Sequence, residues 1–369
     1  MAGVRASLET RNTELQDKVT ELLEEQRQLK ARLNGIEDEN RDLKVANEGY
    51  MQQILNLRPF EPDQKPYHLQ VDFRDFSSHL DSWAFKWTAR FFDSGEEYVN
   101  RWLSDMSSSK RVFLQFQESL QSIPDLYQAV GYPDTDLEIF TAWLLRFIWG
   151  RVFGDFTMKP TGVLTAIEAL MPQCKEPRLD MAAIQDWRGQ AYHAVFTDPE
   201  YPQVRQRAID VFSAALAETL AFIPEPSQKA AFTQSIPALF EPCFDIYEKC
   251  QRSDTNYYID VTYPTRQNVP DVVSRLFRKE VYCLSTKRHT IFTVDKLERQ
   301  PTPVEVQQQL HIIFSIRPAF KMRDWKLTNG RERILQQERL FIAWDPDLVE
   351  RGNPAQVKEE TWLSRVCAL

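Results

Sequence analysis

Apolar side chains recur every seven residues along the first part of the chain. In the stretch LKARLNGIEDENRDLKVAN, the residues Leu29, Ile36 and Leu43 keep this spacing, and the same phase is apolar or aromatic over about seven heptads. A strict period of 3.5 residues keeps one stripe of a helix facing a partner helix. The pattern therefore predicts a long coiled-coil helix over residues 1–58.

The second heptad position, four residues after the first, mixes apolar and amide side chains. Two asparagines that meet across a parallel two-stranded axis hydrogen-bond to each other and disfavour shifted registers and higher oligomers. We therefore predict a leucine zipper-like parallel homodimer, or a pairing with a related coiled-coil protein. The predicted dimerisation residues are Leu8, Leu15, Val19, Leu22, Leu29, Leu33, Ile36, Asn40, Leu43 and Asn47.

Charged residues flank this predicted seam with alternating sign. In a parallel dimer, each residue on one side of the seam faces the partner residue five positions later. Exposed pairs of this kind add only a few tenths of a kcal/mol each, so they select the alignment more than they supply binding energy. The pairs expected here are Glu25 with Lys30, Arg32 with Glu37, and Glu39 with Lys44.

A helical hairpin is the alternative to the dimer. Asn34-Gly35 is a turn dipeptide, and glycine costs about 1 kcal/mol inside a helix. The heptad phase continues across the dipeptide, however, and both residues fall at outward positions. A helix packed on the body of its own chain, or on another partner, also stays open.

The segment resembles the dimerisation half of a basic leucine zipper without its basic arm. In that family a basic helix precedes the coil and enters the major groove of DNA. Here the basic residues up to Asn12 are Arg5 and Arg11, against Glu9. This departure falls where DNA contact would be made, which favours assembly alone.

Prolines and a change from helical patterns to β-rich runs divide the rest of the chain. Three prolines in LRPFEPDQKPYH predict a linker over residues 59–72. Residues 73–253 carry helical patterns, including the almost wholly apolar DLEIFTAWLLRFIWGRVF, which predicts a buried central helix. Residues 254–369 contain β-rich runs such as NYYIDVTY, EVYCLS, TIFTV and RLFIAW. The expected fold is mainly α, with an irregular helical domain and an α+β C-terminal region packed on it.

Charge is distributed unevenly along this body. The chain as a whole has a net charge of -8, whereas residues 264–333 hold 14 Lys and Arg against 7 Asp and Glu. Cations interleaved with aromatic rings suit phosphates and exposed bases. The simpler interpretation is a solvated face, or packing against acidic helices. The candidate nucleic-acid-binding residues are Arg317, Lys321, Arg323, Trp325, Lys326 and Arg331.

Motifs for chemistry are missing from the sequence. None of the 11 glycines forms a phosphate-binding loop, and neither G-x-S-x-G nor H-E-x-x-H occurs. The best zinc candidate, formed by Cys243, Cys250, Cys283 and His289, is spaced more loosely than structural zinc sites are. We therefore predict no catalytic, cofactor or metal residues. Scattered cysteines and the lack of a signal or membrane-spanning segment indicate a cytoplasmic or nuclear protein.

Three stretches carry a further resemblance. AWLLRFIWGRVFGDF, AIQDWRGQAYHAVF and RLFIAWDPDLVERG are similar to proteins of filamentous fungi that have an N-terminal coiled coil and a helical body. That group implies no activity or site residues. The sequence favours a non-enzymatic scaffold or regulatory adaptor that self-associates through residues 8–57. A transcription-related DNA-binding protein and an enzyme with an unrecognised site in the helical body are the alternatives.

Overall fold

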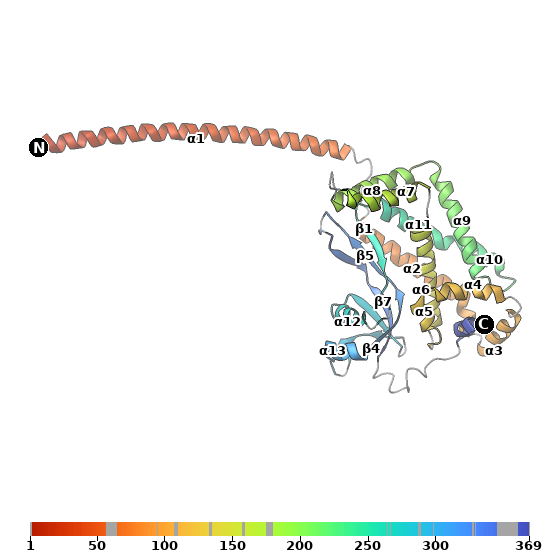
Figure 1. The fold of residues 1–369 in the computed structure, drawn as a ribbon. Coiled ribbons are helices and arrows are strands. Elements are labelled where there is room, and N and C mark those ends of the chain that lie inside the picture. Colours follow the sequence, from red (N-terminus) through yellow and green to blue (C-terminus); the bar gives the residue numbers. More distant parts are fainter. Residues whose placement is uncertain are drawn as a thin grey trace. The chain divides into compact units, whose positions relative to one another are not determined.

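A single helix, α1, runs from Ala2 to Asn56 without a break. The structure is a computed structural model that describes residues 2–56, 65–93, 95–106, 110–132, 135–156, 159–174, 180–263, 265, 267–286, 289–297, 299–326, 328, 330–344 and 361–368. The chain divides into two units, residues 1–61 with α1 and residues 62–369, called the body below. Figure 1 labels most of the elements of each unit.

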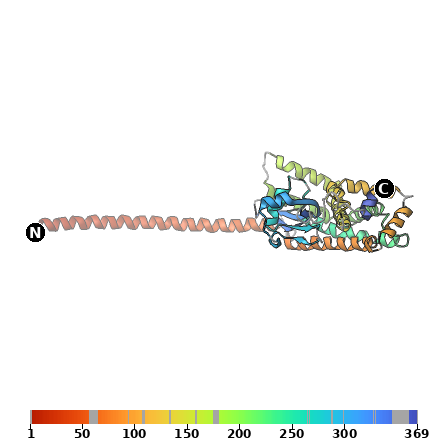
Figure 2. The same ribbon diagram turned by 90° about the horizontal axis from the view of Figure 1, so that it is seen from below.

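Helices make up most of the first two thirds of the body. The long helices α2, α6, α8, α9 and α11 surround one core, and shorter helices close its ends (Figures 1 and 2). Their bounds are α2 Pro66–Asp93, α3 Gly95–Met106, α4 Lys110–Gln121, α5 Pro124–Ala129, α6 Asp136–Trp149, the π-helix η2 Gly150–Asp155, α7 Lys159–Leu170, η3 Met171–Gln173, α8 Met181–Phe196, α9 Tyr201–Thr219, α10 Lys229–Ser235 and α11 Pro237–Arg252.

The predicted central helix is α6, and nearly all of its apolar residues are buried. Aromatic rings fill much of the core around it, as in the T-shaped contact of Trp143 with Phe116, whose ring centroids lie 4.9 Å apart. Such pairs add about 0.5–1.5 kcal/mol beyond the area that they bury. The aromatic residues that are frequent in the sequence therefore serve mainly as core.

Strands enter after residue 255 and form two sheets. Sheet A is antiparallel with strand order β1-β5-β6, and sheet B is mixed with order β3-β2-β7-β4, in which β2 and β7 are parallel. The bounds are β1 Asn256–Asp260, α12 Val269–Phe277, β2 Val281–Ser285, β3 Ile291–Phe292, η4 Val294–Lys296, α13 Pro303–Gln309, β4 Leu310–Arg317, β5 Ala319–Arg323, β6 Glu332–Gln336, β7 Glu338–Trp344 and the C-terminal helix α15 Trp362–Ala368.

Most of β7, in the middle of sheet B, is covered on both faces. Along β7, Phe341 and Ala343 join the helical core, whereas Leu340, Ile342 and Trp344 join a second core beneath α12 and α13. Successive side chains of a strand point to opposite faces, so a strand covered on both sides needs a continuous apolar run. The sequence RLFIAW has that composition for this reason.

Sheet A is buried on one face only. Phe320 and Met322 of β5 lie in the helical core, where Phe320 stacks on Phe73 with ring centroids 4.8 Å apart. Between and after them, Lys321 and Arg323 project from the other face. Alternation with a period of two therefore places the basic side chains of this strand on the polar face of the sheet.

A buried carboxylate ties sheet B, the segment that follows β1 and α12 together. Glu338, fully buried at the start of β7, accepts hydrogen bonds from the backbone N–H and hydroxyl of Thr262 at 2.7 and 2.6 Å, and from the Ser315 hydroxyl at 2.9 Å. The guanidinium of Arg275 donates to the same carboxylate at 2.9 Å. Segments that are far apart in the sequence thus meet at one side chain.

The expected fold class is confirmed: the chain is mainly α, with a long N-terminal helix and small sheets in the C-terminal region. One segment differs in detail from what we expected. Helix α2 begins at Pro66, inside the range 59–72 assigned to a linker, because a proline is tolerated in the first helical turn. Further along, α13 ends at Gln309 and β4 follows at once.

Candidate functional site

The first candidate site is the apolar stripe of α1. Its described members, Val19, Leu22, Leu29, Leu33, Ile36 and Leu43, expose 56–61% of their surface, and Asn40 between them is exposed as well. Leu8, Leu15 and Asn47 belong to the same helix at positions where only the backbone is described. We call the seven described residues the α1 stripe.

The turn that a hairpin requires at Asn34-Gly35 does not form. Helix α1 continues through both residues, and a Cβ added at Gly35 would meet nothing within 4 Å. Every described side chain from residue 18 to residue 46 is exposed. The hairpin alternative was therefore wrong, because outward positions of a helix accept both residues without breaking its hydrogen bonds.

Charges along α1 fall into two groups. The ion pairs that the structure describes, Glu24 with Arg27 at 3.7 Å and Asp38 with Arg41 at 3.4 Å, lie at outward heptad positions. The residues beside the stripe form no ion pair among the described side chains. These residues, available to a partner helix, are Glu25, Lys30, Arg32, Glu37, Glu39 and Lys44.

The second candidate site is the stretch that holds the candidate nucleic-acid-binding residues, Arg317 to Arg331, which we call the basic aromatic segment. It comprises the end of β4, the strand β5 and the turn before β6. Lys321 and Arg323 lie on β5, Trp325 and Lys326 lie in the turn, and Arg331 is exposed just before β6. Gly330 has a φ of +75°, and a Cβ there would come within 2.2 Å of the Trp325 ring. The ring thus packs against its own turn.

Four cations of this segment have carboxylate partners within the body. Lys321 contacts Asp260 at 2.6 Å, and Lys326 contacts Asp186 at 2.5 Å and Asp254 at 2.9 Å. Arg323 pairs with Glu332, and Arg317 pairs with Asp81. Much of the basic charge is therefore neutralised inside the molecule, as the simpler interpretation of the segment proposes.

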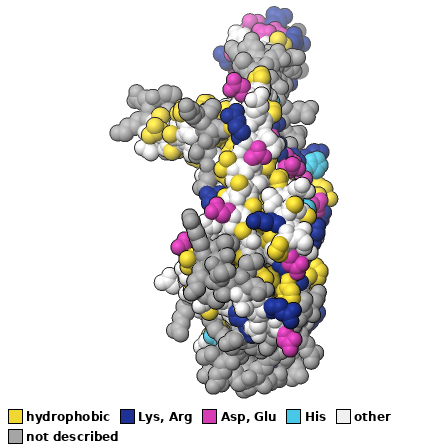
Figure 3. Space-filling view, turned by 90° about the vertical axis from the view of Figure 1, so that its right-hand side faces the viewer, with side chains coloured by type: hydrophobic (Ala, Val, Ile, Leu, Met, Phe, Trp, Pro, Cys, Tyr) yellow, Lys and Arg dark blue, Asp and Glu magenta, His cyan; other side chains and the backbone are white. Residues whose placement is uncertain are grey.

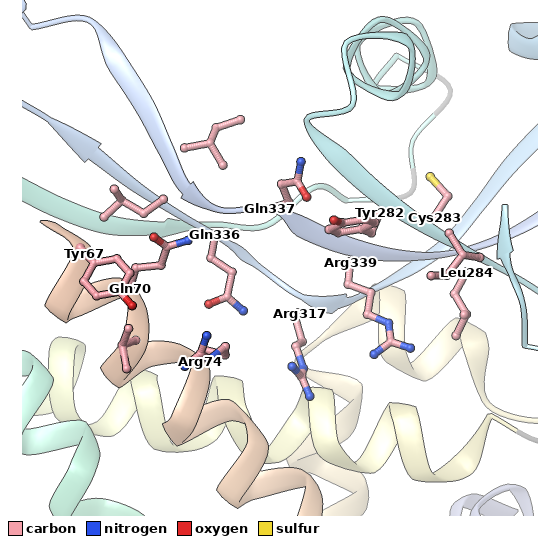
Figure 4. A pocket seen from close by; sticks show the side chains of 14 residues that line it. Tyr67, Gln70, Arg74, Tyr282, Cys283, Leu284, Arg317, Gln336, Gln337 and Arg339 are labelled. Carbon is pink, nitrogen blue, oxygen red and sulfur yellow. The ribbon is translucent and has the colours of Figure 1, made fainter. Parts of the chain in front are cut away.

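A third candidate, which the sequence did not suggest, is a cavity of about 730 Å³ between the start of α2 and the two sheets. Its described lining holds three arginines and no carboxylate. Figure 4 shows Arg317 and Arg339 extending side by side from their strands, and Arg74 on α2. The other labelled residues are Tyr67, Gln70, Tyr282, Cys283, Leu284, Gln336 and Gln337. We call this cavity the arginine pocket.

Two of the arginines are direct neighbours across strands. Arg317 of β4 is the register partner of Arg339 of β7. Burial, together with the positive charge of Arg339, lowers the pKa of Arg317 to about 10. A smaller cavity of about 370 Å³ shares both arginines and also contains Asp81 and Glu138. Arg339 is exposed and makes no ion pair among the described residues.

The cysteines that we weighed as zinc ligands lie apart. Cys243 and Cys250 belong to the helical core, whereas Cys283 belongs to the core beneath α12. Burial, with the neighbouring Glu338 carboxylate, raises the pKa of the Cys283 thiol to about 12, so it stays protonated. Within the described residues, no cluster of three or more His, Cys, Asp or Glu side chains could hold a metal ion.

One face of the body mixes charges of both signs. In Figure 3, Lys and Arg side chains are interspersed with Asp and Glu and with apolar groups. Of the helices that the structure describes, none is both long and apolar enough to cross a membrane.

No family profile, curated protein or solved structure matches the chain. The similarity to fungal proteins stays a prediction.

Proposed function

We propose that the chain is a non-enzymatic scaffold or regulatory adaptor that assembles as a parallel homodimer through α1 and presents two copies of the body. The observation that carries this proposal is the exposed α1 stripe on an unbroken helix. Apolar side chains at strict heptad spacing gain free energy only when a second helix covers them. Isolated helices also have little stability in water without such packing.

A second copy of the same chain fits the stripe better than a different partner does. In a parallel pair in register, the charges beside the stripe meet with opposite sign: Glu25 with Lys30, Arg32 with Glu37, and Glu39 with Lys44. Asn40 meets its own equivalent at the axis, where two amides satisfy each other. Self-complementarity of this kind supports a homodimer with parallel strands.

Replacing Asn40 with leucine tests the parallel two-stranded arrangement. We expect the association to become more stable, because a buried polar pair gives way to an apolar one, and we expect species larger than a dimer to appear. Thermal unfolding followed by circular dichroism reports the stability, and sedimentation velocity reports the stoichiometry.

The matched control is Asn34→Leu, which makes the same chemical change at an outward position of the same helix. It should leave the stoichiometry unchanged, because Asn34 does not face the partner. Equal behaviour of the two variants would show that Asn40 is not at the axis, and the proposed register would then be wrong.

A further inference from the structure

We infer that the arginine pocket binds a phosphorylated small molecule, with the phosphate between Arg317 and Arg339 and the organic part along Tyr282. The pocket belongs to the body and is independent of the α1 stripe. Its volume of about 730 Å³ falls in the range of small-ligand sites. The pocket joins α2 to both sheets, so a bound ligand would contact three parts of the body.

The arrangement of like charges is the first reason. Arg317 and Arg339 stand opposite each other on antiparallel strands, where like charges destabilise a sheet. Asp81 pairs with Arg317 from the neighbouring cavity, but Arg339 has no ion-pair partner among the described residues. An anion between the two guanidinium groups removes this repulsion.

The setting in an acidic protein is the second reason. The chain has a net charge of -8, yet the described lining of the pocket contains three arginines and no carboxylate. The third cation, Arg74, exposes most of its side chain, and its one ion pair within the described part of the chain is with the neighbouring Asp75, at 3.3 Å. Exposed pairs of this kind are weak and exchange readily for a better partner. The positive potential of Arg339 and Arg74 therefore adds, in one concave site, to that of Arg317, whose charge Asp81 partly neutralises.

The chemistry of the lining selects the class of ligand. Guanidinium groups present fixed pairs of N–H donors that match phosphate oxygens in a bidentate manner. Gln70 and Gln336, which lie beside the arginines in Figure 4, supply neutral donors and acceptors. On the side of β2, Tyr282 exposes 53% of its surface and offers a ring on which a planar group can stack. Phosphate and a ring system together describe a nucleotide-like molecule.

The pocket is built for binding. Its cysteine, Cys283, is buried, and the Glu338 carboxylate beside it disfavours a thiolate. Neither a histidine nor a carboxylate occurs among the described lining residues to act as a general acid or base. Ligand binding is therefore the role that these side chains support.

Titration calorimetry on the full chain tests this inference with pyrophosphate, adenosine monophosphate and citrate. We expect the two phosphorylated probes to bind and Arg339→Gln to weaken both by about tenfold or more, the usual effect of losing a charge-assisted hydrogen bond. Tyr282→Ala should weaken adenosine monophosphate by about fivefold or more, as expected for lost stacking, and leave pyrophosphate unchanged.

The control is Arg207→Gln, which removes a positive charge from an exposed position of α9 outside the pocket. It should leave every affinity unchanged. The inference is overturned if neither phosphorylated probe binds, or if Arg339→Gln and Arg207→Gln behave alike. Citrate binding as tightly as pyrophosphate would show that the site does not select phosphate, and an unchanged affinity of Tyr282→Ala for adenosine monophosphate would refute the placement of the organic part.

Discussion

Glu338→Ala is expected to lower the free energy of unfolding of the body by about 3–5 kcal/mol, the usual cost of removing one partner from a buried ion pair. The side chain of Arg275 is only 7% exposed, and the carboxylate left to it would be that of Asp271, 3.7 Å away at the surface, beside its hydrogen bond to the Thr262 hydroxyl at 3.0 Å. The N–H of Thr262 and the hydroxyl of Ser315 would also lose their acceptor. A buried donor without a partner costs about 1–3 kcal/mol.

Urea unfolding followed by tryptophan fluorescence measures this loss as a lower midpoint. Glu280→Ala is the matched control, since Glu280 also pairs with an arginine, Arg278 at 3.0 Å, but the side chains of Arg278 and Glu280 are 56% and 37% exposed. Surface pairs contribute about 0–1 kcal/mol, so the control should move the midpoint little. If the two variants lower the midpoint equally, the carboxylate of Glu338 does not hold sheet B, the segment after β1 and α12 together.

The double substitution Leu29→Asp and Ile36→Asp is expected to convert the proposed dimer to monomers. Burying a Leu or Ile side chain contributes about 1.5–3 kcal/mol, and the dimer loses four of them. The new carboxylates also oppose their equivalents in the partner helix, and burying unpaired charge is costly. The dissociation constant should rise by at least about a thousandfold. Sedimentation equilibrium over a range of concentrations measures it.

Val45→Asp provides the control for this second prediction. Val45 is as exposed as the stripe, at 64%, but lies at an outward heptad position. Its replacement removes an apolar side chain from α1 without touching the predicted interface, so the dissociation constant should stay the same. If both variants lose association, the partner helix does not select the heptad positions of the α1 stripe, and the proposed interface would be wrong.

The sequence predicted those elements whose pattern is local. The apolar run of α6 and the heptads of α1 each indicate a helix by themselves, and the runs NYYID, VYCLS and RLFIAW fall in β1, β2 and β7. These signals need no knowledge of distant neighbours, because periodicity and β-propensity are properties of one segment.

Two local signals were present but not used. Basic and apolar residues alternate in AFKMR, as they should in the half-buried strand β5. The segment was interpreted from its positive charge, and the period of two that indicates a strand was overlooked. Thr302, Pro303 and Glu305 form a capping box with proline in the first turn, which marks the start of α13. Either signal would have refined the interpretation of residues 302–323.

The arginine pocket could not be predicted, because its members come together only through strand pairing. Arg317 and Arg339 become neighbours in the antiparallel register of β4 with β7, and Tyr282 approaches through the parallel pairing of β2 with β7. Nothing in the spacing of these residues indicates contact. The buried partners of Glu338 are non-local in the same way, 23 to 76 residues away in the sequence.

Assembly through the α1 stripe is the central claim, and the molar mass of the full chain in solution tests it most directly. Size-exclusion chromatography with light scattering at physiological salt should give twice the 43.3 kDa of one chain, since the heptad stripe and the self-complementary charges beside it specify two helices. A mass of 43.3 kDa that does not change as the protein concentration rises would contradict it.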